Sequence, residues 1–252
     1  MLTALKGFPL VQEGDHLSAM INSALESNGI ELQEGDVLII AQKVISKAEG
    51  RQVDLASVVP SAEAQSLAEK TDKDPRLVEL ILQESDSILR HRPGLIIAEH
   101  KLGFVCANAG IDRSNVQQEG EAAHDRVLLL PEDPTRSARE IREYLEGRWN
   151  CRIGILIIDS HGRAWRQGTV GISIGFSGLP GIVDKVGDPD LFGYELKVTR
   201  IAAVDELAGA ASLIMGQAGE GLPVIHARGF PYPLRDGDFS ELPREQQSDL
   251  FR

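Results

Sequence analysis

The sequence has few cysteines and no long apolar run. Only Cys106 and Cys151 occur among 252 residues, which excludes a disulfide framework and favours a reducing cytoplasm. The longest apolar runs, such as Val37–Ala41 and Ile153–Ile158, have the length of a strand, far below the ~18 residues of a membrane-spanning helix. The N-terminus also lacks the basic-then-apolar plan of a signal peptide. These absences predict a cytoplasmic protein with no membrane partner.

Positive charge is scarce as well. Lys and Arg number 26 against 38 Asp and Glu, and the formal net charge is −12. Sequence-independent nucleic-acid binding needs clustered Lys and Arg to neutralise phosphates, so no nucleic-acid partner is expected. The hydrophobic content of 42% and charged content of 25% are typical of a globular protein. No linker-like stretch marks a domain boundary, so we expect residues 1–252 to form a single domain. This domain could consist of two interlocked subdomains.

The common catalytic motifs are absent. The chain has no GxxxxGK[ST] phosphate loop, no GxGxxG, no HExxH and no CxxC. Its histidines are scattered, which makes a histidine-rich zinc site improbable and favours ordinary surface or core roles for each of them. They are His16, His91, His100, His124, His161 and His226.

Apolar periodicity and turn residues predict a mixed set of elements. Helices are expected over residues 15–27, 62–70, 75–84, 134–146 and 202–215, the first capped by Asp15 and the third by Asp74. Strands are expected over residues 37–42, 95–99, 104–107, 127–130, 154–158, 170–175, 195–199 and 223–228. The order lacks regular βαβ alternation, so it favours an α+β fold with mixed, largely antiparallel sheets and packed helices. The helix over 202–215 is rich in Ala and Gly and is expected to pack deeply.

Two polar segments follow apolar strands and could bind charged groups. Residues 41–51 carry Lys43 and Lys47, which could hold phosphate oxygens, although a solvated strand edge also carries lysine. Residues 105–115 carry Asp112 and Asn115, whose oxygens suit Mg²⁺ or Mn²⁺, although both residue types also favour an Asx turn.

A third segment, residues 157–168, is the most informative. It places Asp159 at the end of a buried strand, followed by a hydroxyl, a glycine and the arginines Arg163 and Arg166. Metal ligands together with fixed positive charge are what phosphoryl transfer needs, although an aspartate after a strand can simply cap a helix. The fourth segment, the glycine-rich turn over 215–223, could bind phosphates or could only end the preceding helix.

These segments closely resemble the coenzyme F420 γ-glutamyl ligase family, whose members add glutamate to a deazaflavin coenzyme with GTP. The residues that carry the resemblance span nearly the whole chain in order. They are Gly7 to Val11, GDVLIIAQKVISKAEGR from Gly35 to Arg51, CANAGIDRSN from Cys106 to Asn115, LLPEDPTRSAREIR from Leu129 to Arg142, IIDSHGRAWRQG from Ile157 to Gly168, and DELAGAASLIMGQAGEGLPVI from Asp205 to Ile225. The chain resembles the stand-alone form, without the flavin-reductase-like domain that follows in actinobacterial relatives.

The resemblance implies an α+β ligase fold in an interlocked homodimer, two divalent cations per site (Mg²⁺ or Mn²⁺), and help from K⁺. The residues that would contact GTP are Phe8, Pro9, Leu10, Val11, Gln42, Lys43, Lys47, Asn115, Met215, Gly216, Gln217, Ala218, Gly219, Glu220, Gly221 and Leu222. Those that would ligate metal are Asp112, Asp159, Ser160 and Gln217. At residues 160–162 the family usually has Thr-Phe-Gly where this chain has Ser-His-Gly, so that His161 replaces an aromatic residue of the substrate wall.

The implied reaction runs through an acyl phosphate. The terminal carboxylate of the precursor F420-0 attacks the γ-phosphate of GTP, and the amine of L-glutamate then displaces phosphate, with further γ-linked glutamates to follow. We expect Asp112, Asp159, Arg163 and Arg166 to serve this chemistry. The alternatives are a metal-dependent phosphohydrolase, which would release phosphate without an acceptor, and a non-catalytic GTP-binding dimer.

Overall fold

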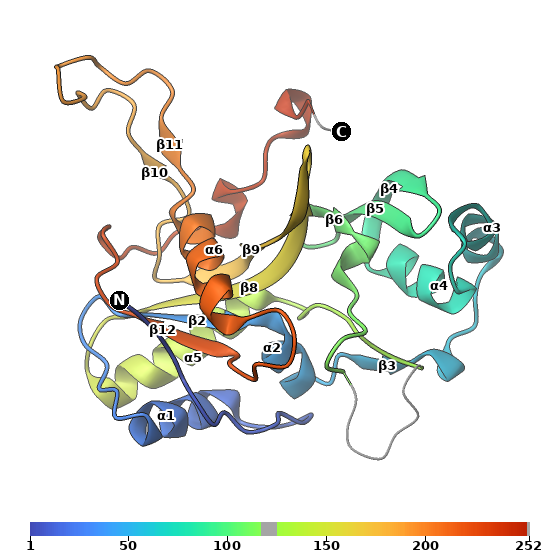
Figure 1. Ribbon diagram of the computed structural model, residues 1–252, viewed down its shortest axis with the longest axis horizontal. Helices are drawn as coiled ribbons and strands as arrows, with labels where there is room; N and C mark the ends of the chain where they lie inside the picture. Colours follow the sequence, from blue (N-terminus) through green and yellow to red (C-terminus); the bar gives the residue numbers. More distant parts are fainter. Residues whose placement is uncertain (117–124, 251–252) are drawn as a thin grey trace.

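A five-stranded mixed sheet forms the centre of the computed structural model, which describes residues 1–116 and 125–250 (Figure 1). The strand order is β1 (Leu2–Ala4), β12 (Val224–Ala227), β2 (Val37–Ala41), β8 (Gly154–Arg163) and β9 (Arg166–Ser177). Only β2 and β8 are parallel, and the other neighbours are antiparallel. The predicted α+β class is therefore confirmed. Within the described ranges, no helix has both the length and the apolar content to cross a membrane.

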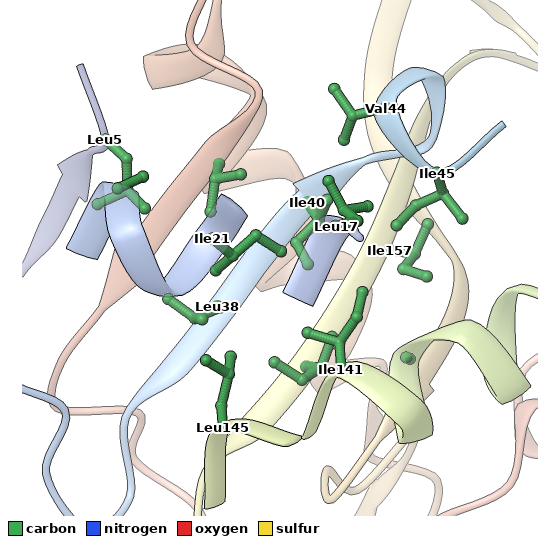
Figure 2. Close-up of a cluster of buried hydrophobic side chains, with 14 of the residues drawn as sticks. Leu5, Leu17, Ile21, Leu38, Ile40, Val44, Ile45, Ile141, Leu145 and Ile157 are labelled. Carbon is green, nitrogen blue, oxygen red and sulfur yellow. The ribbon is translucent and has the colours of Figure 1, made fainter. Parts of the chain in front are cut away.

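The two faces of this sheet bury different helices. Successive residues of a strand point to opposite faces, and β2 and β8 are apolar on both. On one face, Leu38, Ile40 and Ile157 pack against α1 (Leu17–Ser27) and α5 (Pro134–Trp149), as Figure 2 shows. On the other face, their neighbours in sequence pack against α6 (Ala203–Met215). The central strands are thus fixed from both sides.

A second group of elements lies beside the sheet (Figure 1). It contains α3 (Ala62–Thr71), α4 (Pro75–Gln83), the antiparallel sheet β4 (Ser85–Arg92), β5 (Leu95–His100) and β6 (Val105–Ala107), and the pair β3 (Gln52–Asp54) with β7 (Arg126–Leu128). Arg51 helps to hold the group in place, because its guanidinium donates to the carbonyl of Leu130 at 2.9 Å and to Glu84 at 2.6 Å.

A long excursion, residues 183–201, leaves the body of the molecule, and we call it the arm (Figure 1). Its base is the two-stranded pair β10 (Val183–Asp184) and β11 (Arg200–Ile201). The strand predicted over 195–199 is wrong, since Glu195 forms only an isolated bridge with Pro189. The two limbs of the arm are joined by separate backbone hydrogen bonds, such as Leu196 to Asp188, and these do not form a regular ladder over 195–199.

The predicted helices are confirmed, with two local differences. His16, not Asp15, caps α1: its Nδ1 accepts from the amide of Ala19 at 3.2 Å, while Asp15 accepts from the amide of Gln12. A short helix that the sequence did not predict, α2 (Gln42–Ala48), begins directly where β2 ends.

The strand β8 is longer than predicted. It continues through Asp159 to Arg163 because β9 pairs with it over that whole length. Asp159 therefore lies inside a strand and does not follow its end, which also corrects its interpretation as a possible helix cap.

Candidate active site

A cavity of about 670 Å³ opens where β2 and β8 pass side by side. Ala41 pairs with Ile158 at the end of this parallel register, and the next residue of each segment, Gln42 at the start of α2 and Asp159 in β8, lines the cavity. The cavity walls come from the segment before α1, from α2, from residues 107–115, from β8 and β9, and from the turn after α6. All four polar segments singled out in the sequence thus meet at one place.

The lysines of α2 face this cavity four residues apart, on one side of the helix. Lys43 forms an ion pair with Asp112, with Nζ 2.7 Å from Oδ2, and donates to the hydroxyl of Ser114. Burial, and then the charge of Lys43, lower the pKa of Lys47. The carboxamide of Gln42 is buried, and its Nε2 has no hydrogen-bond partner among the described residues. That nitrogen is a donor whose hydrogen-bonding capacity no described residue satisfies.

Asp112 is held by protein groups on both of its oxygens. Its Oδ1 accepts from the amide and the hydroxyl of Ser114, which is the Asx turn that the sequence left open, and its Oδ2 faces Lys43. Burial favours a raised pKa, but the hydrogen bonds from Lys43 and Ser114 outweigh it and bring the pKa of Asp112 below its ordinary value. A cation at Asp112 would have to share this carboxylate with Lys43.

The glycine-rich turn is joined to two of the other segments. Gln217 accepts from the hydroxyl of Ser160 at 2.7 Å, and the carbonyl of Ala218 accepts from Asn115 at 2.9 Å. Gly216 ends α6 with a φ of 75°, a backbone conformation that favours glycine. The turn is therefore part of the cavity wall as well as a helix end.

Asp159, Ser160 and Gln217 line the cavity and offer a carboxylate, a hydroxyl and an amide oxygen. Oxygen donors of this kind fit a hard divalent cation. In the described part of the chain, no group of three or more His, Cys, Asp and Glu could hold a metal ion. A cation here would need the hydroxyl and amide oxygens, and it would not be zinc in a histidine site.

His161 is a cavity residue whose surroundings the sequence did not reveal. It is buried, with Nε2 3.0 Å from Oδ2 of Asp159 in an orientation that makes no hydrogen bond. Its ring lies 5.3 Å from that of Phe104, on which His100 stacks at 5.4 Å. The spacing could have indicated that His161 lies near Asp159. The two residues are two positions apart on one strand, and such residues point to the same face. His124 lies outside the described residues.

The structure places nearly all predicted site residues along the cavity. The lining includes Phe8 to Val11, Gln42, Lys43, Lys47, Asp112, Asn115, Asp159, Ser160 and Met215 to Leu222. Arg163 and Arg166 are the exceptions. They pair with each other in register at the outer end of the β8–β9 hairpin and do not line the cavity, because the strands continue past it. Their part in the chemistry of the transferring phosphoryl group stays a prediction.

Comparison with known proteins shows the protein family to which the chain belongs. The profile of the F420-0:Gamma-glutamyl ligase family matches residues 7–229. A relative from Methanothermobacter thermautotrophicus, described as a coenzyme F420:L-glutamate ligase, is 46% identical over 100% of this chain and 98% of its own length. Relatives of the same description from Methanopyrus kandleri and Archaeoglobus fulgidus are 49% and 39% identical. They cover 96% and 98% of this chain, and 93% and 94% of their own lengths.

The match defines an amide-forming ligase of coenzyme F420 biosynthesis. The chain belongs to the F420-0:gamma-glutamyl ligase family.

Proposed function

We propose that this enzyme joins L-glutamate to the deazaflavin precursor F420-0 at the expense of GTP. The observation that carries the proposal is the meeting of the four polar segments in one cavity, which gathers lysines, carboxylates and a glycine-rich turn from distant parts of the chain. The names of the relatives supply the acceptor and the amino acid.

The nucleotide is the ligand that this cavity suits best. Lys43 and Lys47 can neutralise phosphate oxygens, and the turn over 216–221 brings backbone close to them. GTP rather than ATP follows from the family resemblance.

Asp159, Ser160 and Gln217 would hold one Mg²⁺ or Mn²⁺ ion, and Asp112 a second; K⁺ would assist from an unassigned position. Such ions supply positive charge against the transferring phosphoryl group and its leaving oxygen. Asp112 has a further task, because its ion pair fixes Lys43 in the cavity.

The chemistry proceeds in two transfers. The terminal carboxylate of F420-0 attacks the γ-phosphorus of GTP, GDP leaves, and an acyl phosphate forms. The amine of L-glutamate then attacks the acyl carbon, loses a proton and displaces phosphate, which leaves an amide. A γ-linked second addition repeats the sequence on the new carboxylate. The protein's residues contribute by aligning the carboxylate with the γ-phosphate, and later the acyl phosphate with the amine, and by excluding water, which would hydrolyse the acyl phosphate.

We also propose that the enzyme works as a homodimer. The arm exposes large apolar side chains, with Leu191 96% and Phe192 94% accessible. Exposed apolar surface of this kind marks interaction sites, and a second copy of the chain is the partner that the family resemblance implies.

The proposal is tested by incubating F420-0 with enzyme, L-glutamate, Mn²⁺ and GTP, followed by mass spectrometry. The expected product carries one or more added glutamyl residues. Phosphate release that does not depend on the acceptor or on glutamate would instead identify a phosphohydrolase, and GTP binding without turnover would identify a non-catalytic dimer. Titration should show GTP binding at least about tenfold more tightly than ATP.

A further inference from the structure

The β8–β9 hairpin extends beyond the part of the cavity assigned to nucleotide and metal. Gly162 and Thr169 pair in register, and both line the cavity. The next pair outward is Arg163 with Arg166. An irregularity in β9 at Gln167 and Gly168 separates these two pairs, so the hairpin extends from Asp159 outward to two arginines with a shift of register before them.

These two arginines are exposed cations at the edge of the cavity. Among the described residues, neither has an ion-pair partner, whereas Lys43 inside the cavity forms an ion pair with Asp112. In a protein with a net charge of −12, two adjacent unpaired guanidinium groups make a local site for an anion.

Trp165 lies in the turn between the arginines. It is 89% exposed and has a φ of 64°, an uncommon conformation for a bulky residue. Backbone conformations of this strained kind cluster at ligand-binding and active sites. An exposed indole between two arginines in sequence is a combination that suits a flat ring with an anionic substituent.

We propose that this hairpin tip binds the acceptor: Arg163 and Arg166 hold an anionic group of the acceptor, and Trp165 contacts its planar ring. The inference rests on the proposed function for the identity of the acceptor. Four residues of strand separate Asp159 from Arg163, which spans about 13 Å. A deazaflavin with a long acidic side chain can reach from the tip to the phosphoryl-transfer end of the cavity, and L-glutamate cannot.

The experiment compares the double variant Arg163→Gln/Arg166→Gln with wild type. Acceptor binding is measured without GTP, from the fluorescence of the deazaflavin, and KM values for acceptor, GTP and glutamate are measured by product formation. The acceptor Kd and KM should rise about tenfold or more, while the KM values for GTP and glutamate change less than about twofold.

Two further variants sharpen this test. Arg163→Lys/Arg166→Lys keeps both charges but loses the forked donors, so it should restore acceptor binding in part. Arg139→Gln removes an exposed arginine of α5, away from the hairpin, and should leave acceptor binding unchanged. Added salt should weaken acceptor binding by wild type more than by the glutamine double variant, because two charge contacts have been removed.

An unchanged acceptor Kd in the glutamine double variant would overturn the inference. A rise in the KM for GTP alone would also overturn it and would assign the arginines to the nucleotide. If wild type binds the acceptor and the double variant does not, yet wild type forms no glutamyl product, the proposed function fails while the acceptor site at the hairpin stands.

Discussion

The carboxylate of Asp159 is the strongest candidate metal ligand at the level of single residues. Ser160, its neighbour in β8, donates a hydrogen bond to Gln217, and all three residues line the cavity. Asp159→Asn keeps the size of the side chain and removes its charge. We expect ligation to fall by about 10²-fold or more, with little change in melting temperature.

The measurement is turnover across a series of Mn²⁺ concentrations. Asp86→Asn, at an exposed position of β4, is the matched control and should keep full activity. Wild-type turnover by Asp159→Asn at limiting Mn²⁺ would contradict the assignment.

His100 should make the stability of the protein depend on pH. Burial and then the charges of Arg51, His161 and Lys101 lower the pKa of His100 to about 4. Between the ordinary pKa of 6.5 and about 4, the unfolded chain binds a proton here that the folded protein does not. The free energy of unfolding therefore falls as the pH drops through this range, by roughly 3 kcal/mol at the acid end.

Urea unfolding at several pH values between 7 and 4 measures this slope. His100→Asn keeps an acceptor for the amide of Leu102, which now donates to Nδ1, but does not titrate. The variant should lose stability less steeply toward low pH than wild type. Equal slopes in the two proteins would show that other groups account for the acid sensitivity.

At the scale of elements, the contact between α6 and β9 positions the site. A Cβ at Gly171 would lie 2.6 Å from the backbone oxygen of Ala208 and 2.7 Å from Cβ of Ser212. Gly171→Ala must therefore push α6 away from the sheet and shift the turn that carries Gln217. We expect a loss of about 1–3 kcal/mol in stability and a larger loss of ligation, because a displacement of ~1 Å can cost ~10²-fold in rate.

Gly209 provides a control from the same interface. A Cβ there would meet Val170 at 3.5 Å, an ordinary contact, and alanine favours a helix by about 0.5–1 kcal/mol over glycine. Gly209→Ala should keep or raise the melting temperature and keep activity. Equal tolerance of both substitutions would show that α6 packs loosely on β9.

Sequence periodicity was sufficient for the elements that have a buried face. The helix over 202–215 shows the limit of this kind of prediction. Ala208 and Ala211 are fully buried as expected, but Ala210 is exposed, so only one face of the helix packs deeply. The helix α2 escaped prediction because it has seven residues and no side-chain cap, which leaves neither a periodic pattern nor a start signal.

The sequence predicted the residues of the candidate site where they belong to recognisable motifs. It did not predict the contacts between these residues. Lys43 and Asp112 are far apart in sequence, and nothing local to either residue shows that they form an ion pair. Arg163 and Arg166 were placed at the phosphoryl group because they follow Asp159 closely in sequence. An extended hairpin separates neighbours in sequence by over 3 Å per residue, and that distance becomes visible only once the strand pairing is known.

At the scale of the whole molecule, the arm is the feature that a single chain does not explain. Leu191, Phe192 and Val198 are each at least 85% exposed on it, so isolated chains would keep apolar side chains in water. Ion pairs between Lys185 and Asp188 and between Arg200 and Asp184 give the base of the arm a defined shape. A shaped apolar projection suits docking on a second copy, where burial stabilises by about 25 cal/mol per Å² of apolar surface.

The double substitution Leu191→Ser/Phe192→Ser should therefore convert a dimer into monomers, as measured by light scattering during size-exclusion chromatography and by sedimentation at several concentrations. Lys197→Ser changes a charged residue of the same arm and should leave the dimer intact, because surface ion pairs contribute little. A monomeric wild type, or a serine variant that remains dimeric at the lowest concentration, would contradict the role of the arm. Ligation measured on the monomeric variant then separates two cases. Retained turnover means that each cavity is complete in one chain, and lost turnover at an unchanged melting temperature means that the dimer completes it.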